Sequence, residues 1–235
     1  MYRRIVLKLS GETLAPLASN GSVFDKDRVD ECARMLIKIA AEGVQLAVIL
    51  GGGNIWRGRF NPDMDPVTAD QMGMLATVLI ALCCAEAVNR LGGKAKVFTA
   101  QEMTRFAELY RADRADEALN DGYIVFAAGG TGNPFFTTDS AAALRACELR
   151  CDALLKGTKV DGVYDADPVK HPEAKRYETL TFDKAIADNL KVMDQTAFTL
   201  CKENDMPIIV FNMNDEGTLE KVVEGNGRCT VLSNK

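Results

Sequence analysis

The sequence has a single histidine, His171, which lies in a proline-flanked loop. Ser-His-Asp hydrolysis needs a histidine base beside the nucleophile, so the chain has no credible site for that chemistry. Three nucleotide-handling signatures are also missing: G-x-x-x-x-G-K-[ST], G-x-G-x-x-G after a strand, and the H-R-D and D-F-G kinase pair. These absences exclude a P-loop NTPase and a protein kinase, and they weaken a dinucleotide-binding interpretation.

Cysteine is present but not in a pattern that binds metal. The seven cysteines form an odd set without a C-x-x-C, so zinc-site spacing is missing. Reduced, buried thiols are the simplest interpretation. The formal net charge is −5 and the pI about 5.1, which provides no electrostatic footprint for nucleic acid or an anionic membrane. An anionic substrate would have to be held by a local cluster of donors.

Long apolar runs are also scarce. The longest one without charge spans 71–85, which is shorter than the ~20 residues of a membrane span. Because it is apolar all round, it predicts a helix buried in the core or in a dimer contact. The first apolar stretch, 5–7, is interrupted at once by Lys8, so no signal peptide is expected and the location predicted is cytoplasmic.

What is there is a regular alternation of strand and helix patterns. Strands are predicted at 3–9, 44–50, 95–99, 123–128, 153–156, 207–212 and 229–232, with a polar loop from the first strand to Phe24. Helices are predicted between an N-cap at Asp25 and Gly43, at 67–91, about 114–120, from a cap at Asp139 to about 150, and at 183–189, 194–204 and 216–224. This order predicts an α/β fold: a three-layer α/β/α sandwich around a mostly parallel sheet.

Three glycine-rich segments come directly after predicted strands, at 10–11, 51–54 and 129–133. Ligands of parallel sheets bind at the carboxyl ends of the strands, so these segments are expected to open on one edge. Glycines 51–53 could form an anion-binding nest, and Arg57 could grip phosphate oxygens. The alternatives are a tight turn and a solvated surface arginine.

The segment 131–140 is more specific, because it gathers hydroxyls, an amide and backbone donors just before a helix. A helix N-terminus favours an anion, and Phe135 and Phe136 could pack against a base or ribose. In the alternative interpretation the two phenylalanines fill the core and Asp139 is simply an N-cap. Capping and substrate contact are compatible.

Two lysines fall at the ends of predicted strands. Lys8 is costly to bury there unless it is paired, which favours a lysine directed at phosphate over one on an exposed edge. The segment 156–168 combines cations, a tyrosine and carboxylates, as in a hairpin that cradles a nucleotide. The alternative is a charged, solvated turn.

Together these motifs resemble the amino acid kinase superfamily, and within it most closely the bacterial UMP kinases. The similarity rests on 8–11, 51–54, 131–139, 159–163 and 167–168, with further matches at 70–74, 192–194 and 211–214, and covers essentially the whole chain. The resemblance implies phosphorylation of UMP to UDP by ATP with Mg²⁺ carried by the ATP, in pyrimidine nucleotide biosynthesis. It also implies a single domain, 1–235, with about 1–150 binding the acceptor and about 151–235 binding ATP, and a homohexamer built as a trimer of dimers.

The resemblance assigns roles residue by residue. The catalytic residues it implies are Lys8, Arg57 and Asp139, with Asp139 organising the metal or the lysine. Contacts to ATP are expected from Lys8, Leu9, Ser10, Gly11, Gly53, Arg57, Thr158, Tyr164 and Asp167. Contacts to UMP are expected from Gly52, Asp70, Thr131, Gly132, Asn133, Pro134, Phe135, Phe136, Thr137 and Thr138, with Asp70 facing the ribose. No protein side chains are expected to form a separate metal site.

Two parts depart from the family's pattern. Residues 15–23 replace a glycine-containing segment, and a basic position used in GTP regulation has no clear counterpart near Lys96. Regulation by the effectors GTP and UTP is therefore left open, as are the relative roles of Lys8 and Lys156. Two rival functions also stay open: a sister kinase acting on a carboxylate or carbamate, and a nucleotide sensor without activity.

Overall fold

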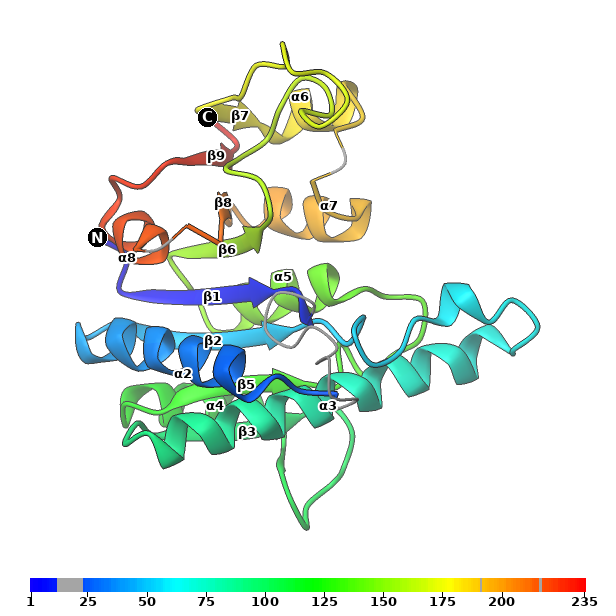
Figure 1. Ribbon diagram of the computed structural model, residues 1–235, viewed down its shortest axis with the longest axis vertical. Helices are drawn as coiled ribbons and strands as arrows, with labels where there is room; N and C mark the ends of the chain where they lie inside the picture. Colours follow the sequence, from blue (N-terminus) through cyan, green and yellow to red (C-terminus); the bar gives the residue numbers. More distant parts are fainter. Residues whose placement is uncertain (12–22, 191, 216) are drawn as a thin grey trace.

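The computed structural model describes residues 1–11, 23–190, 192–215 and 217–235 (Figure 1). Within these residues a nine-stranded sheet has the order β4-β3-β5-β2-β1-β6-β8-β9-β7. The pairs are parallel except β8 with β9, which is antiparallel. The prediction of an α/β fold with a mostly parallel sheet is confirmed. The loop predicted from the first strand to Phe24 falls mainly on 12–22, outside the described residues.

The strands are short and apolar. They are β1 (Arg4–Leu9), β2 (Gln45–Leu50), β3 (Ala95–Thr99), β4 (Glu108–Leu109), β5 (Ile124–Ala128), β6 (Ala153–Thr158), β7 (Thr179–Thr181), β8 (Ile208–Asn212) and β9 (Cys229–Ser233). The central strands are buried on both faces, as expected for parallel strands covered by helices on either side. The two shortest strands, β4 and β7, were not predicted, because two or three residues carry no readable period.

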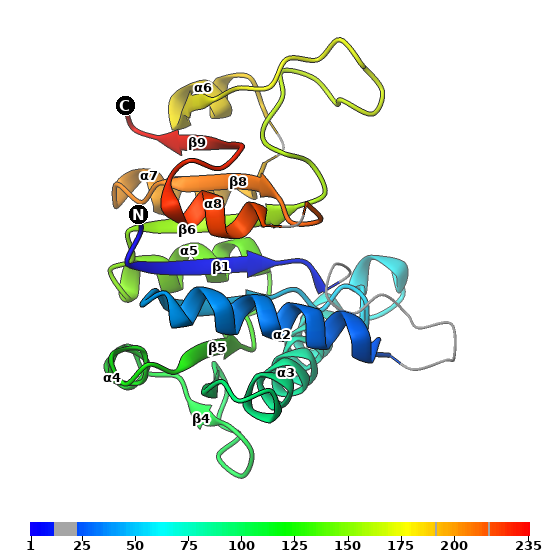
Figure 2. The ribbon, with the colours of Figure 1, turned by 60° about the vertical axis from the view of Figure 1, so that its left-hand side comes forward.

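The helices are α2 (Lys26–Ala41), α3 (Pro66–Arg90), α4 (Ala112–Asn120), α5 (Thr138–Glu148), α6 (Phe182–Ala187), α7 (Gln195–Glu203) and α8 (Thr218–Glu224), with a short 3-10 turn η1 (Gly58–Phe60). One core cluster packs helices α2, α3 and α8 against one face of the sheet (Figure 2). A second cluster packs helices α4, α5, α6 and α7 against the opposite face. The predicted three-layer sandwich is confirmed.

The segment 156–168 differs from its prediction. It does not fold into a hairpin of its own, because Tyr164 forms an antiparallel bridge with the more distant Arg176. Asp161 lies between cations from far along the chain, forming ion pairs with Arg176 and Arg228. Those partners come from outside the segment, so a local pattern could not indicate them.

Helix α3 is long and apolar enough to cross a membrane, but half of its most apolar 18-residue stretch is buried inside the structure. It packs against α2, β3 and β5 as a core helix, as predicted. Leu75 and Leu79, one turn apart, remain about half exposed. The helix therefore contributes to the core on one side and leaves an apolar strip on the other.

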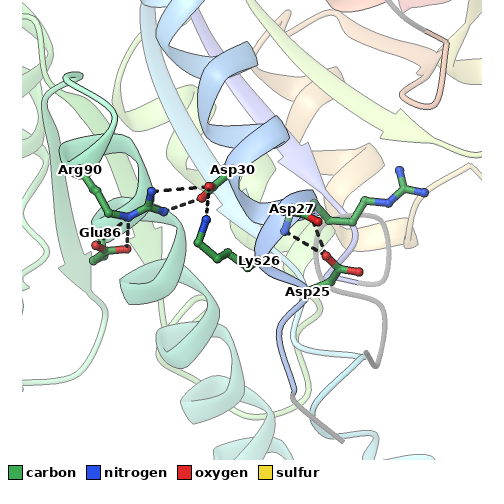
Figure 3. Close-up of polar contacts among 7 residues, drawn as sticks. Asp25, Lys26, Asp27, Asp30, Glu86 and Arg90 are labelled. Atoms are coloured by element: carbon green, nitrogen blue, oxygen red, sulfur yellow. Dashed lines mark hydrogen bonds and ion pairs between the residues drawn. The ribbon is translucent and has the colours of Figure 1, made fainter. Parts of the chain in front are cut away.

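A buried carboxylate joins α2 to α3 (Figure 3). Asp30, almost fully buried, accepts from Arg90 at 2.5 Å and from Lys26 at 2.8 Å. Hydrogen bonds from Arg90 first, and then from Lys26, lower the pKa of Asp30 to about 2. These three residues, called here the helix clamp, hold together the two helices on one face of the sheet.

All seven cysteines are free thiols, and four of them are buried: Cys32, Cys84, Cys151 and Cys201. Burial raises the pKa of Cys32, Cys151 and Cys201 to about 12. Thiols held protonated in this way are poor nucleophiles and poor metal ligands.

Candidate active site

Lys8 and Lys156 stand side by side on neighbouring parallel strands. They are direct register partners across β1 and β6, so their side chains project from the same face of the sheet. Asp139, in the first turn of α5, lies between them. Its carboxylate pairs with the Lys8 ammonium at 2.7 Å through one oxygen and with the Lys156 ammonium at 2.6 Å through the other. We call these three residues the lysine–aspartate triad.

The triad is enclosed, and this shifts its protonation equilibria. Burial opposes ionisation of Asp139, but the charges of Lys8 and Lys156 outweigh burial and hold the pKa of that carboxyl below its usual value. Burial lowers the pKa of Lys156, and the attraction of Asp139 only partly offsets this effect. With both lysines protonated, the triad carries two positive charges and one negative charge, and this surplus suits an anion.

The turns after β1 and β2 touch each other beside the triad. A Cβ built on Gly11 would lie 2.1 Å from the Gly51 carbonyl oxygen, so only glycine fits there. Gly51 also donates its N–H to the Leu9 carbonyl at 3.0 Å. The predicted convergence of these two turns at one rim of the sheet is therefore present, and Leu9 reaches it only through its backbone because its side chain is buried.

A cavity of about 140 Å³ opens next to these turns. Seven of the ten residues expected to hold UMP line it: Gly52, Asp70, Thr131, Asn133, Phe136, Thr137 and Thr138. Gly53, Trp56, Gly73, Met74, Thr77 and Gly130 complete the lining. Gly132 and Pro134 instead line a second cavity of about 250 Å³ on the other side of the loop. The Phe135 side chain is largely exposed and lines neither cavity.

The loop after β5 has an unusual backbone that α3 holds in place. Phe135 has φ of +68°, in the left-handed region that disfavours a bulky residue. Its N–H donates to the Asp70 carboxylate at 2.6 Å, which supports this conformation. The Thr77 hydroxyl accepts from the Gly129 N–H at 2.8 Å, so two residues of α3 position this loop.

The α5 N-terminus faces the first cavity, because Thr137 and Thr138 line it and α5 begins at Thr138. The N-cap is Thr137, whose hydroxyl accepts from the N–H groups of Asp139 and Ser140. The prediction that Asp139 caps this helix is wrong. With Thr137 as cap, the Asp139 side chain is available for the two lysines.

Asp194 fastens the same corner to α7. Its carboxylate accepts from the Thr137 hydroxyl at 2.5 Å and from the Ser140 hydroxyl at 2.9 Å. It also caps α7 through the Ala197 N–H at 2.9 Å. The loop between β5 and α5 is therefore connected to an element of the C-terminal part of the chain.

The remaining predicted residues line neither of the two cavities apart from Gly53, and their contacts are mostly local. Arg57 donates to the Gly53 carbonyl at 2.6 Å and lies over the Phe60 ring, next to the first cavity. Thr158 ends β6 and bonds the Val160 backbone. Tyr164 donates to Asp161 at 2.5 Å, and Asp167 is exposed and accepts from the Val169 N–H. Ser10 follows β1 directly, between Leu9 and Gly11.

A model of the amino acid kinase family matches residues 3–212 of the chain. The chain belongs to this family. A uridylate kinase of Bacteroides thetaiotaomicron is 46% identical over 99% of both chains, and one of Parabacteroides distasonis is 47% identical over the same shares. A UMP kinase structure from Ureaplasma parvum matches with a TM-score of 0.93 at 38% identity, over 99% of both chains. One from Bacillus anthracis matches with a TM-score of 0.94 at 33% identity, over 100% of this chain and 97% of that one.

Sequence reasoning assigned no role to two members of this amino acid kinase site, although 192–194 was among the matching segments. Thr77 lies within α3 and Asp194 is the N-cap of α7, and each contacts a segment distant in sequence. A signal existed for Lys156, which lies near the end of its strand as Lys8 does. A lysine at the end of a buried strand is costly unless it is paired, and this marks both positions.

Proposed function

We propose that the chain transfers the γ-phosphoryl group of ATP to UMP, forming UDP and ADP, and serves pyrimidine nucleotide biosynthesis as an enzyme of the cytoplasm. The observation that carries the proposal is the lysine–aspartate triad beside a cavity whose hydroxyl and backbone N–H groups can donate hydrogen bonds to phosphate. The chain that carries it is 46% identical over its length to a uridylate kinase. An oxygen of the UMP phosphate attacks the γ-phosphorus, and the bond from that phosphorus to the β–γ bridging oxygen breaks.

The acceptor is proposed to occupy the cavity of about 140 Å³. The N-terminus of α5 and the Thr137 and Thr138 segment favour its phosphate. Asp70 lies across the cavity as an acceptor for ribose hydroxyls, and Phe136 offers an aromatic surface. A small carboxylate or carbamate would use neither feature, so the sister-kinase alternative is not favoured.

Catalysis here consists of positioning and charge neutralisation. The acceptor oxygen is already deprotonated near neutral pH and needs no strong base. Lys8 is proposed to neutralise the transferred group with help from Arg57, and Asp139 to hold Lys8 in place. Ser10, Gly11, Thr158, Tyr164 and Asp167 are proposed to surround the ATP.

Mg²⁺ is proposed to arrive bound to ATP, where it would supply positive charge that partly neutralises the phosphates. Among the described residues no group of three acidic, histidine or cysteine side chains is arranged to hold a metal. Both oxygens of Asp139 are already engaged by lysine ammonium groups. Phosphate and water oxygens, which Mg²⁺ prefers, fit this donor set better than a protein cage does.

A coupled assay of ADP release tests the proposal, with UMP, CMP, dTMP, glutamate and carbamate as acceptors in turn. We expect turnover with UMP to exceed that with either carboxylate-type acceptor by at least about a hundredfold, because an acceptor that leaves the polar groups of a site unpaired is rejected by roughly 10⁴-fold or more. Turnover of glutamate or carbamate with no response to UMP would establish the sister-kinase alternative. No turnover with any acceptor, combined with tight binding of UMP, would favour a nucleotide sensor.

Assembly is proposed to use α3. Its outer strip, with Leu75 and Leu79 about half exposed and Leu82 and Cys83 partly buried, is apolar and suits a contact between two copies. We propose a dimer through this strip and a homohexamer formed by three dimers. Light scattering at micromolar concentration that gives a monomer would contradict the assembly, and rates with added GTP or UTP would decide whether they are effectors.

A further inference from the structure

Lys156 has no role in the function proposed above, yet it is as closely engaged with Asp139 as Lys8 is. The two lysines are register partners, and their ammonium groups lie 2.7 Å and 2.6 Å from opposite oxygens of one carboxylate. Two like charges on adjacent strands repel each other unless an anion separates them. Asp139 is that anion, and it cannot fully neutralise both lysines.

All three side chains are shielded from water. Their exposed fractions are 13% for Lys8, 14% for Asp139 and 12% for Lys156, so solvent screens their charges weakly. Lys156 is fixed further by a hydrogen bond from its ammonium to the Val192 carbonyl. It is therefore held at the side of Asp139 opposite Lys8.

The charge balance of this cluster depends on Lys156. With Lys156 present, one carboxylate is shared between two cations and the cluster has a net charge of +1. Without it, Lys8 and Asp139 would form a closed ion pair of zero net charge, which attracts a phosphate much more weakly.

We propose that Lys156 is a positioning residue: by taking one oxygen of Asp139, it leaves the Lys8 ammonium with unneutralised charge for the transferred phosphoryl group. This role rests on the proposed function, because it assumes that ATP binds at the rim where Lys8 lies. It is distinct from direct contact with substrate, which is assigned to Lys8.

Several groups surround Lys156 and enter its pH dependence. Asp139 of α5 and Asp194 before α7 favour its charged form, while Lys8 of β1 disfavours it. Asn189 and Gln195 line the adjoining cavity of about 320 Å³ without charge, and β8 presents Val210 at the paired position. Since burial lowers the pKa of Lys156, its proton is lost earlier on the alkaline side than that of an ordinary lysine.

The test compares the wild type with Lys156→Met, Lys156→Arg and the control Lys184→Met. Lys184 lies on α6, is about half exposed, pairs with Asp188 and lies over the Tyr177 ring, so its removal takes away a cation outside the triad. The rate constant kcat and the KM for UMP are measured from about pH 6 to about pH 10, a range that approaches the ordinary pKa of lysine. The Kd of ATP is measured by calorimetry, and the thermal unfolding midpoint is recorded for each variant.

For Lys156→Met we expect kcat to fall by at least about tenfold and ATP to bind more weakly, as when one charge-stabilising donor is removed. The KM for UMP should stay near that of the wild type, because the acceptor cavity is intact. Lys156→Arg should recover part of kcat and move the alkaline decline to higher pH, because guanidinium keeps its proton. Lys184→Met should match the wild type throughout.

Three results would overturn the inference. The first is an unchanged kcat and ATP affinity in Lys156→Met. The second is an equal loss of kcat in the Met and Arg variants, together with a raised KM for UMP and the same alkaline decline of kcat. That combination indicates a merely structural role. If Lys156→Met does not fold, Lys156→Arg decides, and an alkaline decline identical to the wild type counts against the inference.

Failure of the proposed function would look different. A wild type without turnover of UMP rejects that function, whatever the variants do. The ATP affinity still tests the positioning role of Lys156 in that case. The inference requires weaker ATP binding in Lys156→Met than in Lys184→Met, and equal binding in the two variants rejects it.

Discussion

The helix clamp and the lysine–aspartate triad each place one carboxylate between two cations, and they differ in where the cations lie. In the helix clamp, Asp30 is 6% exposed but Arg90 is 39% and Lys26 75% exposed, so water screens the cations. In the lysine–aspartate triad all three side chains are at most 14% exposed. The first arrangement ties two helices together, and the second keeps unscreened positive charge at the rim of the sheet.

This difference separates a structural ion pair from a site. A cation in water loses little when its partner is removed, because solvent replaces the partner. A buried cation cannot be compensated in this way, so a ligand that supplies negative charge is favoured. The same local chemistry therefore serves stability at α2 and α3 and is proposed to serve catalysis between β1, β6 and α5.

The largest effect is expected for the cations at the rim. Lys8→Ala and Arg57→Ala should each lower kcat roughly a hundredfold, or about 3 kcal/mol, because each removes charge stabilisation from the transition state. Rates at saturating UMP and ATP provide the measurement. The control is Lys202→Ala, because Lys202 is a surface lysine that pairs with Asp183. Near-full turnover in both rim variants would remove the basis for assigning catalysis to this rim.

A smaller effect is expected at Asp194, whose carboxylate holds Thr137 and Ser140 at the start of α5. Asp194→Ala removes the acceptor for the Thr137 and Ser140 hydroxyls and should raise the KM for UMP roughly tenfold, equal to about 1.4 kcal/mol, within the range for one or two lost hydrogen bonds. Asp25→Ala is the matched control. Asp25 is likewise an N-cap carboxylate, at the start of α2 (Figure 3).

Both variants should lower the thermal midpoint, since each loses a cap. Only Asp194→Ala should change the KM for UMP. If Asp25→Ala changes it equally, Asp194 acts through general stability and not through the loop.

The smallest effect on activity is expected at the helix clamp. The pKa of Asp30 is depressed to about 2 from an ordinary value of about 4, so its contribution to stability is present above about pH 4 and is lost as pH falls toward 2. Asp30→Asn should leave kcat unchanged, lower the thermal midpoint at pH 7, and reduce the acid sensitivity of unfolding. Unfolding curves between about pH 2 and about pH 4, the window between the two pKa values, provide the measurement. A loss of kcat in a folded Asp30→Asn variant would contradict the purely structural role of the helix clamp.

The sequence predicted the layers and the turns but not the long-range contacts. The spacing of apolar residues and the length of each apolar run identified α3 and the buried strands, because those signals are local. The strands β4 and β7 are too short to carry a period. Asp139 was misread as a cap because Thr137, two residues earlier, fills that position.

The site was predicted unevenly for the same reason. Glycine-rich turns after strands indicated the rim, and seven of the expected UMP residues line one cavity. Phe135 does not line it, because its backbone turns the ring outward at a positive φ that the sequence does not reveal. Thr77 and Asp194 reach Gly129 and Thr137 across at least 52 residues of sequence, which no local pattern can indicate.

The most direct measurement is a crystal structure with UMP and a non-hydrolysable ATP analogue whose β–γ bridge is methylene. The γ-phosphoryl group is predicted to lie within hydrogen-bonding distance of the Lys8 ammonium, with the UMP phosphate facing it from the α5 N-terminus and Asp139 still shared with Lys156. A γ-phosphoryl group bound away from Lys8, or UMP outside the cavity that contains Asp70 and Thr138, would contradict this arrangement.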